Sequence, residues 1–206
     1  MRSLTRITRP ALVPELRVRV ADALMPTWEA TERHVGHAVP PPFWAFLWPG
    51  SQALARLIID QPHLVEGKHV FDFGAGCGLA AIAAAYCSAS RALACDIDPM
   101  AADAQYANAQ LNDVLIETQT CDSTRSRLDD MDIVLAGDVC YERAAAREVT
   151  VWLRALAEDG LTVLLADPGR AYAPHQGLER LAAYEVPTTR ELESSDVLHT
   201  VVWRVT

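Results

Sequence analysis

Residues 70–78 read VFDFGAGCG, which is an apolar strand with one acid, running into glycines at alternating positions. The alanine-rich residues 78–86 that follow favour a helix. Strand, glycine turn and helix N-terminus together form the first half of a nucleotide-binding βαβ unit, because glycine lets the backbone approach a ligand closely. The stretch therefore predicts an α/β fold with a ligand bound at the end of this strand.

The same alternation of short apolar runs and helical segments continues outward from this stretch. We predict strands at residues 68–73, 91–95, 115–119, 131–136 and 161–166, and helices at 100–111 and 144–157. A helix near 175–183 and two late strands at 185–192 and 198–205, joined by an acidic turn, complete the pattern. It indicates a Rossmann-like, mostly parallel seven-stranded sheet with a C-terminal antiparallel hairpin and helices on both faces.

The first 50 residues follow a different pattern. Apolar residues at helical spacing predict an amphipathic helix over residues 14–25, and Pro40 to Pro42 require extended backbone. Ser51 is expected to cap a helix that Pro62 ends. We therefore expect residues 1–50 to form a helical and aromatic extension packed on a domain of residues 51–206, a single domain overall.

Composition limits the classes of function. Half of the 206 residues are hydrophobic, and the net charge of -9 argues against a broad nucleic-acid footprint, which needs clustered Lys and Arg. The five cysteines and six histidines lack metal-binding spacings, so we predict no metal. No apolar run is long enough to cross a bilayer. We expect a cytoplasmic, monomeric protein without a membrane or nucleic-acid partner.

Asp72 lies at the end of the strand, directly before the glycine turn. A carboxylate there would repel a dinucleotide pyrophosphate, but it would pair with the cationic methionyl end of S-adenosylmethionine. Gly74, Gly76 and Gly78 also place the third glycine one residue early for the dinucleotide fingerprint. Charge thus favours the sulfonium cofactor, whose product is S-adenosylhomocysteine. The alternative is a purely structural turn in which Asp72 caps the helix.

Further candidate cofactor contacts follow the next two strands. Asp96 stands about twenty residues beyond the glycines, where the ribose hydroxyls of a nucleoside would lie, and Ile97 follows it. Asp98, next to Pro99, is assigned instead to the cap of the following helix. Asp122, after the third strand, could contact the adenine amino group. Nicotinamide enzymes also carry an acid like Asp96, so this feature alone is unspecific.

Asp138 and Tyr141 follow the fourth strand, at the sheet edge where open α/β folds bind substrates. Asp138 could accept a hydrogen bond from an attacking amine beside the methyl donor, and Tyr141 could orient that amine. The alternative is a helix cap at Asp138 and a core tyrosine. The aromatic residues after the proline tract form either core or a lid over a cationic ligand, with Trp48 as the ligand contact.

Five segments, PPFWAFLWPGSQALAR, VFDFGAGCGLAAIAAA, ACDIDPMA, GDVCYE and ADPGR, together resemble the class I methyltransferases, especially the electron-transfer-flavoprotein β-subunit lysine methyltransferases and their bacterial relatives. The resemblance implies an S-adenosylmethionine-dependent protein-lysine N-methyltransferase that acts on the flavoprotein β subunit. It implies catalytic roles for Asp138 and Tyr141. The predicted cofactor contacts are Trp48, Asp72, Gly74, Gly76, Gly78, Asp96, Ile97, Asp122 and Asp138.

Three other functions stay open at this point. The acceptor could be a small, nicotinamide-like amine, or it could be a ribosomal protein, because related enzymes share the fold. A non-catalytic, cofactor-binding regulatory module is the alternative from a different class, and such a module would show no turnover.

Overall fold

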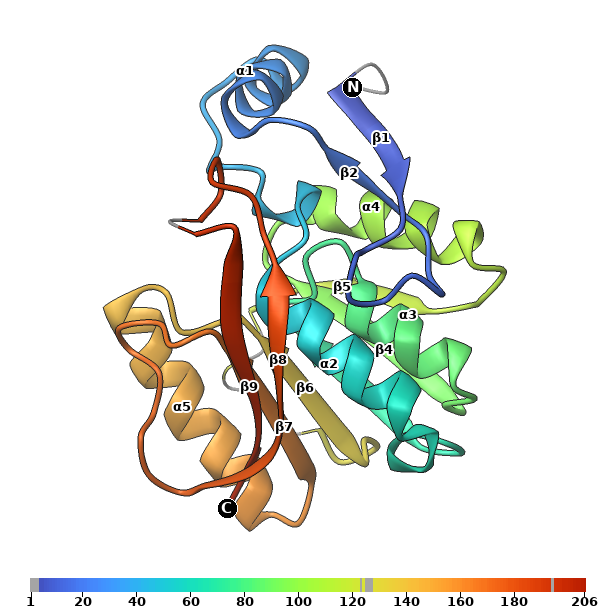
Figure 1. The fold of residues 1–206 in the computed structure, drawn as a ribbon, viewed down its shortest axis with the longest axis vertical. Coiled ribbons are helices and arrows are strands. Elements are labelled where there is room, and N and C mark those ends of the chain that lie inside the picture. Colours follow the sequence, from blue (N-terminus) through green and yellow to red (C-terminus); the bar gives the residue numbers. More distant parts are fainter. Residues whose placement is uncertain (1–3, 123, 125–127, 194) are drawn as a thin grey trace.

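The computed structural model describes residues 4–122, 124, 128–193 and 195–206 (Figure 1). The chain begins with β1 (Thr5–Thr8), β2 (Val18–Ala21), α1 (Leu24–Val35), η2 (Phe43–Ala45), α2 (Pro49–Asp60) and η3 (Pro62–Leu64). It continues with β3 (His69–Phe73), α3 (Leu79–Tyr86), β4 (Arg91–Asp96), α4 (Pro99–Leu111), β5 (Glu117–Thr120) and β6 (Ile133–Gly137). It ends with α5 (Arg143–Glu158), β7 (Thr162–Asp167), β8 (Leu178–Pro187) and β9 (Val197–Val205).

Seven strands form the central sheet in the order β5-β4-β3-β6-β7-β9-β8. The first five strands in this order are parallel, whereas β9 runs antiparallel to both β7 and β8. The predicted mostly parallel sheet with a C-terminal antiparallel hairpin is therefore confirmed. Because β3, β4 and β6 are parallel neighbours, the turns that follow them meet at one edge of the sheet.

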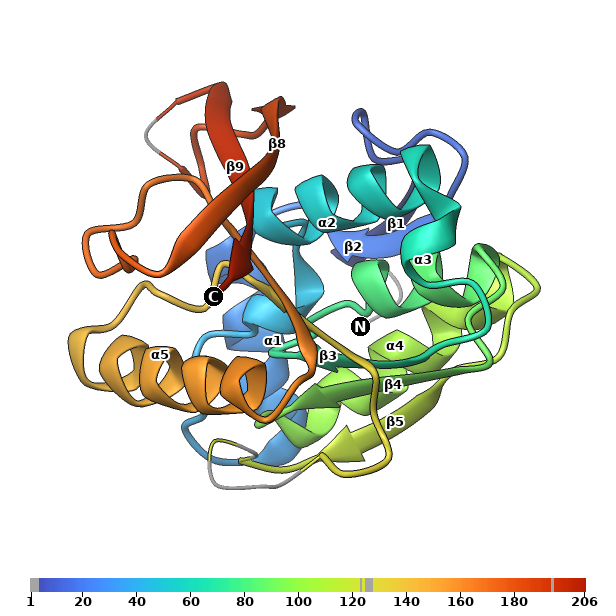
Figure 2. The ribbon, with the colours of Figure 1, turned by 90° about the horizontal axis from the view of Figure 1, so that it is seen from below.

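Side chains that alternate along the strands enter two different hydrophobic clusters. Val70 and Ile133 pack in the cluster that contains α2 and α3, while Phe71 and Val134 pack with α5. Successive strand residues point to opposite faces, so one strand supplies both layers. Figure 2 shows α2 and α3 on one side of the sheet and α5 on the other.

The prediction of a helix over residues 14–25 is wrong. Residues 18–21 form β2, which pairs with β1, and α1 begins only at Leu24. The alternation of Val18 and Val20 with arginines suits a strand as well as a helix. Tertiary contacts decide between them, because Asn108 of α4 and Asn112 at its C-cap accept the backbone N–H groups of Arg19 and Arg17 at 2.7 and 2.8 Å.

The predicted helix near residues 175–183 is wrong as well. Residues 178–187 form β8, whose helix-favouring residues are overridden by pairing with β9 along almost the whole strand. Ser51 is not the cap of α2, which begins at Pro49 with Trp48 at the N-cap. Asp98 does cap α4, because its carboxylate accepts the Met100 N–H at 2.9 Å.

The division of the chain at residue 50 stays a prediction. The helix α2 begins at Pro49, one residue before that boundary, and packs against the strands of the main sheet. In the described part of the chain, no helix is both long and apolar enough to cross a membrane.

Candidate active site

The turn after β3 is built on backbone that glycine adopts readily. Gly74, Gly76 and Gly78 all have positive φ, at 62°, 52° and 83°. At Gly78 a side chain would also meet the side chain of Gln105 at 3.1 Å. Gly78 is the N-cap of α3, so the turn delivers the helix N-terminus to the carboxyl edge of the sheet. The three predicted glycines therefore lie together as one turn.

Asp72 is buried beside this turn, with 3% of its surface exposed. One carboxylate oxygen accepts the Ala81 N–H of α3 at 2.9 Å, so the helix-capping alternative describes a contact that is present. Burial, helped by the charge of Asp96, raises the pKa of Asp72 to about 7, against the lowering effect of the Ala81 hydrogen bond. No Lys or Arg among the described residues forms an ion pair with Asp72. The site thus holds a buried carboxyl group that a cationic ligand would stabilise in its charged form.

Asp96, at the end of β4, faces the same turn. Its two carboxylate oxygens accept the Gly76 N–H at 2.8 Å and the Asp98 N–H at 3.0 Å. Burial raises its pKa, while these backbone hydrogen bonds lower it. Ile97 beside it is 72% exposed, so its surface is open to a ligand.

Asp122 contacts its own loop. Its carboxylate accepts both the backbone N–H and the hydroxyl of Thr124, at 3.2 and 2.8 Å. The preceding Cys121 N–H donates to the Asp96 carbonyl at 3.1 Å. Asp122 thus directly follows a residue that is hydrogen-bonded to Asp96, but its own side chain is exposed.

Two buried polar atoms near the turn have no hydrogen-bond partner among the described residues. They are the indole nitrogen of Trp44, in η2, and the amide oxygen of Gln105, in α4. Gln105 donates to the Gly76 carbonyl at 3.2 Å, and a side chain at Gly76 would lie 3.8 Å from the Trp44 Cα. An unused donor and an unused acceptor beside the glycines fit a ligand that carries both kinds of group.

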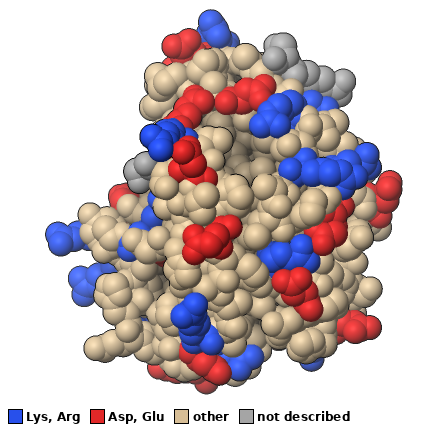
Figure 3. Space-filling model, in the orientation of Figure 1, with Lys and Arg blue, Asp and Glu red and all other residues tan. Residues whose placement is uncertain are grey.

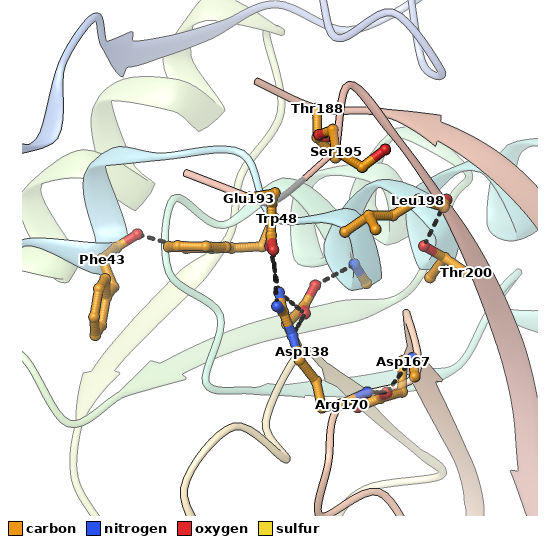
Figure 4. A network of polar contacts seen from close by, with 12 residues as sticks. Phe43, Trp48, Asp138, Asp167, Arg170, Thr188, Glu193, Ser195, Leu198 and Thr200 are labelled. Atoms are coloured by element: carbon orange, nitrogen blue, oxygen red, sulfur yellow. Dashed lines mark hydrogen bonds and ion pairs between the residues drawn. The ribbon is translucent and has the colours of Figure 1, made fainter. Parts of the chain in front are cut away.

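Asp138 lies at the carboxyl end of β6 and is already engaged (Figure 4). One oxygen accepts two N–H groups of Arg170, at 2.9 and 2.7 Å, and the other accepts the Gly50 N–H at the start of α2. Its backbone φ of 59° is left-handed, a strained conformation that often marks functional positions. Burial raises the pKa of Asp138 to about 6, against the lowering effect of Arg170.

Tyr141 is not a core residue, because 60% of it is exposed. Its ring meets that of Phe43 edge-on, with centroids 6.0 Å apart, and Phe43 meets Trp48 at 5.5 Å. The alternative in which Asp138 caps α5 also differs from the structure, because Glu142 holds that N-cap position. The aromatic cluster divides: Trp44 and Phe46 are buried, whereas Phe43 and Trp48 stay accessible beside Tyr141.

Sequence reasoning missed one residue of this edge and assigned no role to another. Glu193, from the segment between β8 and β9, accepts Arg170 N–H groups through both carboxylate oxygens. The β8–β9 hairpin brings Glu193 to Arg170 from a distant part of the chain, so no local spacing signals it. Arg170 stands in the ADPGR segment of the family resemblance, but its side-chain partners come from distant segments.

A hollow opens in the upper part of the face shown in Figure 3, with acidic and basic side chains at its rim. A separate cavity of about 500 Å³ lies at the opposite, amino edge of the sheet, where Lys68, Met131 and Leu161 are among its lining residues. We place the candidate active site at the carboxyl edge, because the buried carboxyl groups and the glycine turn are there.

Comparisons with known proteins agree on one class of enzyme. The sequence profile of the family described as Ribosomal protein L11 methyltransferase (PrmA) matches residues 53–139. The chain is 36% identical to the electron transfer flavoprotein beta subunit lysine methyltransferase of Danio rerio over 204 residues, covering 96% of this chain and 78% of that protein. Its identity to the human protein of the same name is 34%, covering 94% of this chain and 75% of that protein.

Solved structures share the fold at low sequence identity. The tRNA (uracil-54, C5)-methyltransferase of Pyrococcus abyssi, in complex with S-adenosyl-L-homocysteine, matches with a TM-score of 0.59 and 13% identity, over 98% of this chain and 44% of that chain. The magnesium protoporphyrin IX methyltransferase of Synechocystis PCC 6803 matches with a TM-score of 0.54 and 15% identity, over 76% of this chain and 82% of that chain. At these identities the likeness concerns the fold alone.

Proposed function

The chain belongs to the electron transfer flavoprotein beta subunit lysine methyltransferase family, and we propose that it transfers methyl groups from S-adenosylmethionine to lysine side chains of an electron transfer flavoprotein β subunit. The observation that carries the proposal is the buried carboxyl group of Asp72, which pairs with no Lys or Arg of the described residues and lies beside a left-handed glycine turn. A cationic nucleoside is the cofactor chemistry that this pair of features suits.

The residues around the turn fit this cofactor. Asp72 would pair with the ammonium group of the methionyl tail, and Asp96 would accept the ribose hydroxyls. The unused indole N–H of Trp44 would donate to the tail carboxylate, which matches an orphaned buried donor with an acceptor. When bound, the cofactor supplies a methyl group on a sulfonium sulfur. The chain's own residues then have to bind and orient the acceptor amine.

Asp138 and Tyr141 are proposed to hold that amine. An ionised carboxylate offers about four acceptor positions, and three of those on Asp138 are filled by Arg170 and Gly50. One position is left for an N–H of the lysine. Desolvation and the carboxylate of Asp96 raise the pKa of Tyr141, so its hydroxyl stays protonated and can orient the same amine. Phe43 and Trp48 line the approach with aromatic surface, which suits a cationic side chain.

The acceptor is tested directly. Incubation with labelled S-adenosylmethionine and purified electron transfer flavoprotein is expected to place label on lysines of the β subunit, mapped by mass spectrometry. Asp138→Asn is expected to lower turnover by about tenfold or more while the affinity for S-adenosylhomocysteine stays within about threefold. Label on a ribosomal protein or a free amine, with none on the flavoprotein, would refute the proposed acceptor.

The profile match to the ribosomal-protein family does not favour the other acceptor. It ends at residue 139 and so covers the cofactor half, while Tyr141, Arg170 and Glu193 lie outside it. The monomeric state, the cytoplasmic location and the absence of nucleic-acid and membrane partners stay predictions.

Ile97 provides a test of the adenine side of the site. We expect Ile97→Ser to weaken binding of S-adenosylhomocysteine by about tenfold, because loss of apolar contact area costs about 1–2 kcal/mol. The melting temperature should change little, because Ile97 is 72% exposed. Leu115→Ser is the matched control, since Leu115 is 92% exposed and lies before β5. Equal effects of the two variants on affinity would contradict a ligand contact at Ile97. Isothermal titration calorimetry measures the affinities of both variants, and thermal unfolding measures their melting temperatures.

A further inference from the structure

The guanidinium group of Arg170 lies between two carboxylates that come from distant parts of the chain (Figure 4). Its Nε and Nη2 donate to one oxygen of Asp138, at 2.9 and 2.7 Å, and Nη1 donates to Glu193 at 2.9 Å, while Nη2 also contacts Glu193. Both carboxylate side chains are more than nine-tenths buried. Arg170 thus forms a bidentate pair with Glu193, whereas Asp138 accepts two of its N–H groups on a single oxygen, which stabilises the charged form of that carboxylate.

Negative charge outnumbers positive charge in this cluster. Asp167, at the end of β7, is also buried, and one of its oxygens has no hydrogen-bond partner among the described residues. Two carboxylates therefore contact one guanidinium, and a third, Asp167, accepts the backbone N–H of Arg170 at 2.6 Å. The charge of Asp167 raises the pKa of Asp138, whereas Arg170 lowers it.

The other groups that face Asp138 leave Arg170 as its only described cationic partner. The start of α2 contributes the Gly50 N–H, and β7 contributes Asp167. Cys140 stays a neutral thiol, because burial raises its pKa to about 12. Tyr141, on the same loop, stays a neutral phenol at ordinary pH. The ionisation of Asp138 thus depends on how fully Arg170 is committed to it.

We propose that Arg170 is a positioning residue of the methyl transfer reaction, which holds the Asp138 carboxylate charged and correctly turned, and that Glu193 competes with Asp138 for the same guanidinium. The inference rests on the proposed function, because it assigns Asp138 to the acceptor amine. It adds two residues, from the β7 end and from the β8–β9 connection, that act on the amine only through Asp138.

The segment that carries Glu193 is anchored by the two residues directly before it. Glu191 accepts the Leu24 N–H at the start of α1 at 3.0 Å, and Leu192 packs in the cluster formed by η2, Leu24 and Trp48. The carboxylate of Glu193 is thus held in place by a segment that packs against α1 and η2. A change of charge at Glu193 should therefore act on Arg170 without releasing the segment.

Two variants should move the ionisation of Asp138 in opposite directions. Arg170→Gln removes the cation, so the pH at which Asp138 ionises is expected to rise by about one unit or more. Glu193→Gln removes a competing charge and frees the guanidinium for Asp138, so that pH is expected to fall. Carboxyl-carbon NMR titration measures both, with Asp138→Asn identifying the resonance. The acid limb of the kcat/KM profile should shift in the same sense for each variant.

Controls separate positioning from general structure. Arg190→Gln breaks an exposed ion pair with Asp196 near the same segment and should change neither the titration nor turnover. Arg170→Lys keeps the charge without the fork, so it should restore the ionisation of Asp138 but only part of kcat. Affinity for S-adenosylhomocysteine, which should stay within about threefold in all variants, reports an intact cofactor site.

The outcomes decide between the two claims. An unchanged titration of Asp138 in Arg170→Gln, or shifts of the same sign in Arg170→Gln and Glu193→Gln, would overturn the positioning role. If the wild-type protein methylates no lysine while the two NMR shifts remain opposite, the proposed function fails and the control of Asp138 by Arg170 stands.

Discussion

Asp72→Asn is expected to lower the affinity for S-adenosylhomocysteine about 100-fold while leaving the protein at least as stable as the wild type. Loss of one partner from a buried charge pair costs about 3 kcal/mol, which corresponds to that factor. Asparagine keeps the shape of the side chain and an oxygen that can accept the Ala81 N–H. The helix cap therefore survives, and only the charge that faces the ligand is lost.

The stability of this variant should depend on pH in a defined direction. Burial raises the pKa of Asp72 to about 7 from the ordinary value of 3.8, so ionising it in the folded protein is unfavourable. This penalty is absent below about pH 4, grows as the pH rises toward 7, and is constant above it. The melting temperatures of wild type and Asp72→Asn should therefore agree at low pH, and the variant should be the more stable protein near pH 8.

Ligand affinity should show the complementary dependence. The ammonium group of S-adenosylhomocysteine favours ionised Asp72, so below pH 7 binding must release a proton, and affinity rises with pH until about 7. Asp72→Asn should remove that rise. Calorimetry between pH 5.5 and 8.5 measures both effects. Asp132→Asn is the control, because Asp132 accepts the His69 N–H at the opposite end of β3. If Asp72→Asn and the wild type bind S-adenosylhomocysteine with equal affinity, the Asp72 carboxylate does not contact the cofactor.

The closeness of the residues in the proposed cofactor half of the site could be predicted because its signals are local. Asp72, Gly76 and Asp96 stand at the ends of two strands whose apolar pattern is plain, and parallel strands bring their carboxyl ends to one edge. The structure then joins them by the hydrogen bond from the Gly76 N–H to Asp96. Sequence spacing was sufficient, because the contacts lie within one βαβ unit.

The acceptor half could be predicted only in part, because its contacts join distant segments. Asp138 was placed correctly at the end of β6, but its partners come from α2 and from the loop after β7. Glu193 reaches them only because residues 178–187 form an edge strand, although their composition favours a helix. The N-terminal strand shows the same limit, since the side chains of α4 select strand over helix.

Gly50→Ala is expected to be strongly destabilising, although alanine is the better helix former by about 1 kcal/mol. A Cβ at this position in α2 would lie 2.5 Å from the Asp138 nitrogen, 2.7 Å from the Ala166 carbonyl oxygen and 2.9 Å from the Gly137 carbonyl carbon. All three atoms belong to the backbone of β6, β7 or the turn after β6, so no side chain can rotate away. The start of α2 would have to withdraw from the sheet edge.

This withdrawal should affect catalysis more than cofactor binding. The Gly50 N–H is one of three donors that fix Asp138, whereas Asp72 and Asp96 are held by other segments. We expect a loss of about 1–3 kcal/mol in the free energy of unfolding, typical of overpacking, and a fall in kcat of about tenfold or more. Denaturant unfolding and single-turnover methylation measure the two effects.

Gly36→Ala is the matched control for this variant. Gly36 has a φ of 80°, and an added Cβ would meet nothing within 4 Å, so only the left-handed conformation should cost stability, by about 1 kcal/mol. Its kcat should equal that of the wild type, because it lies at the end of α1. If Gly50→Ala behaves like Gly36→Ala in both measurements, α2 does not position Asp138. The close approach of α2 to the end of β6 would then be packing without a catalytic consequence.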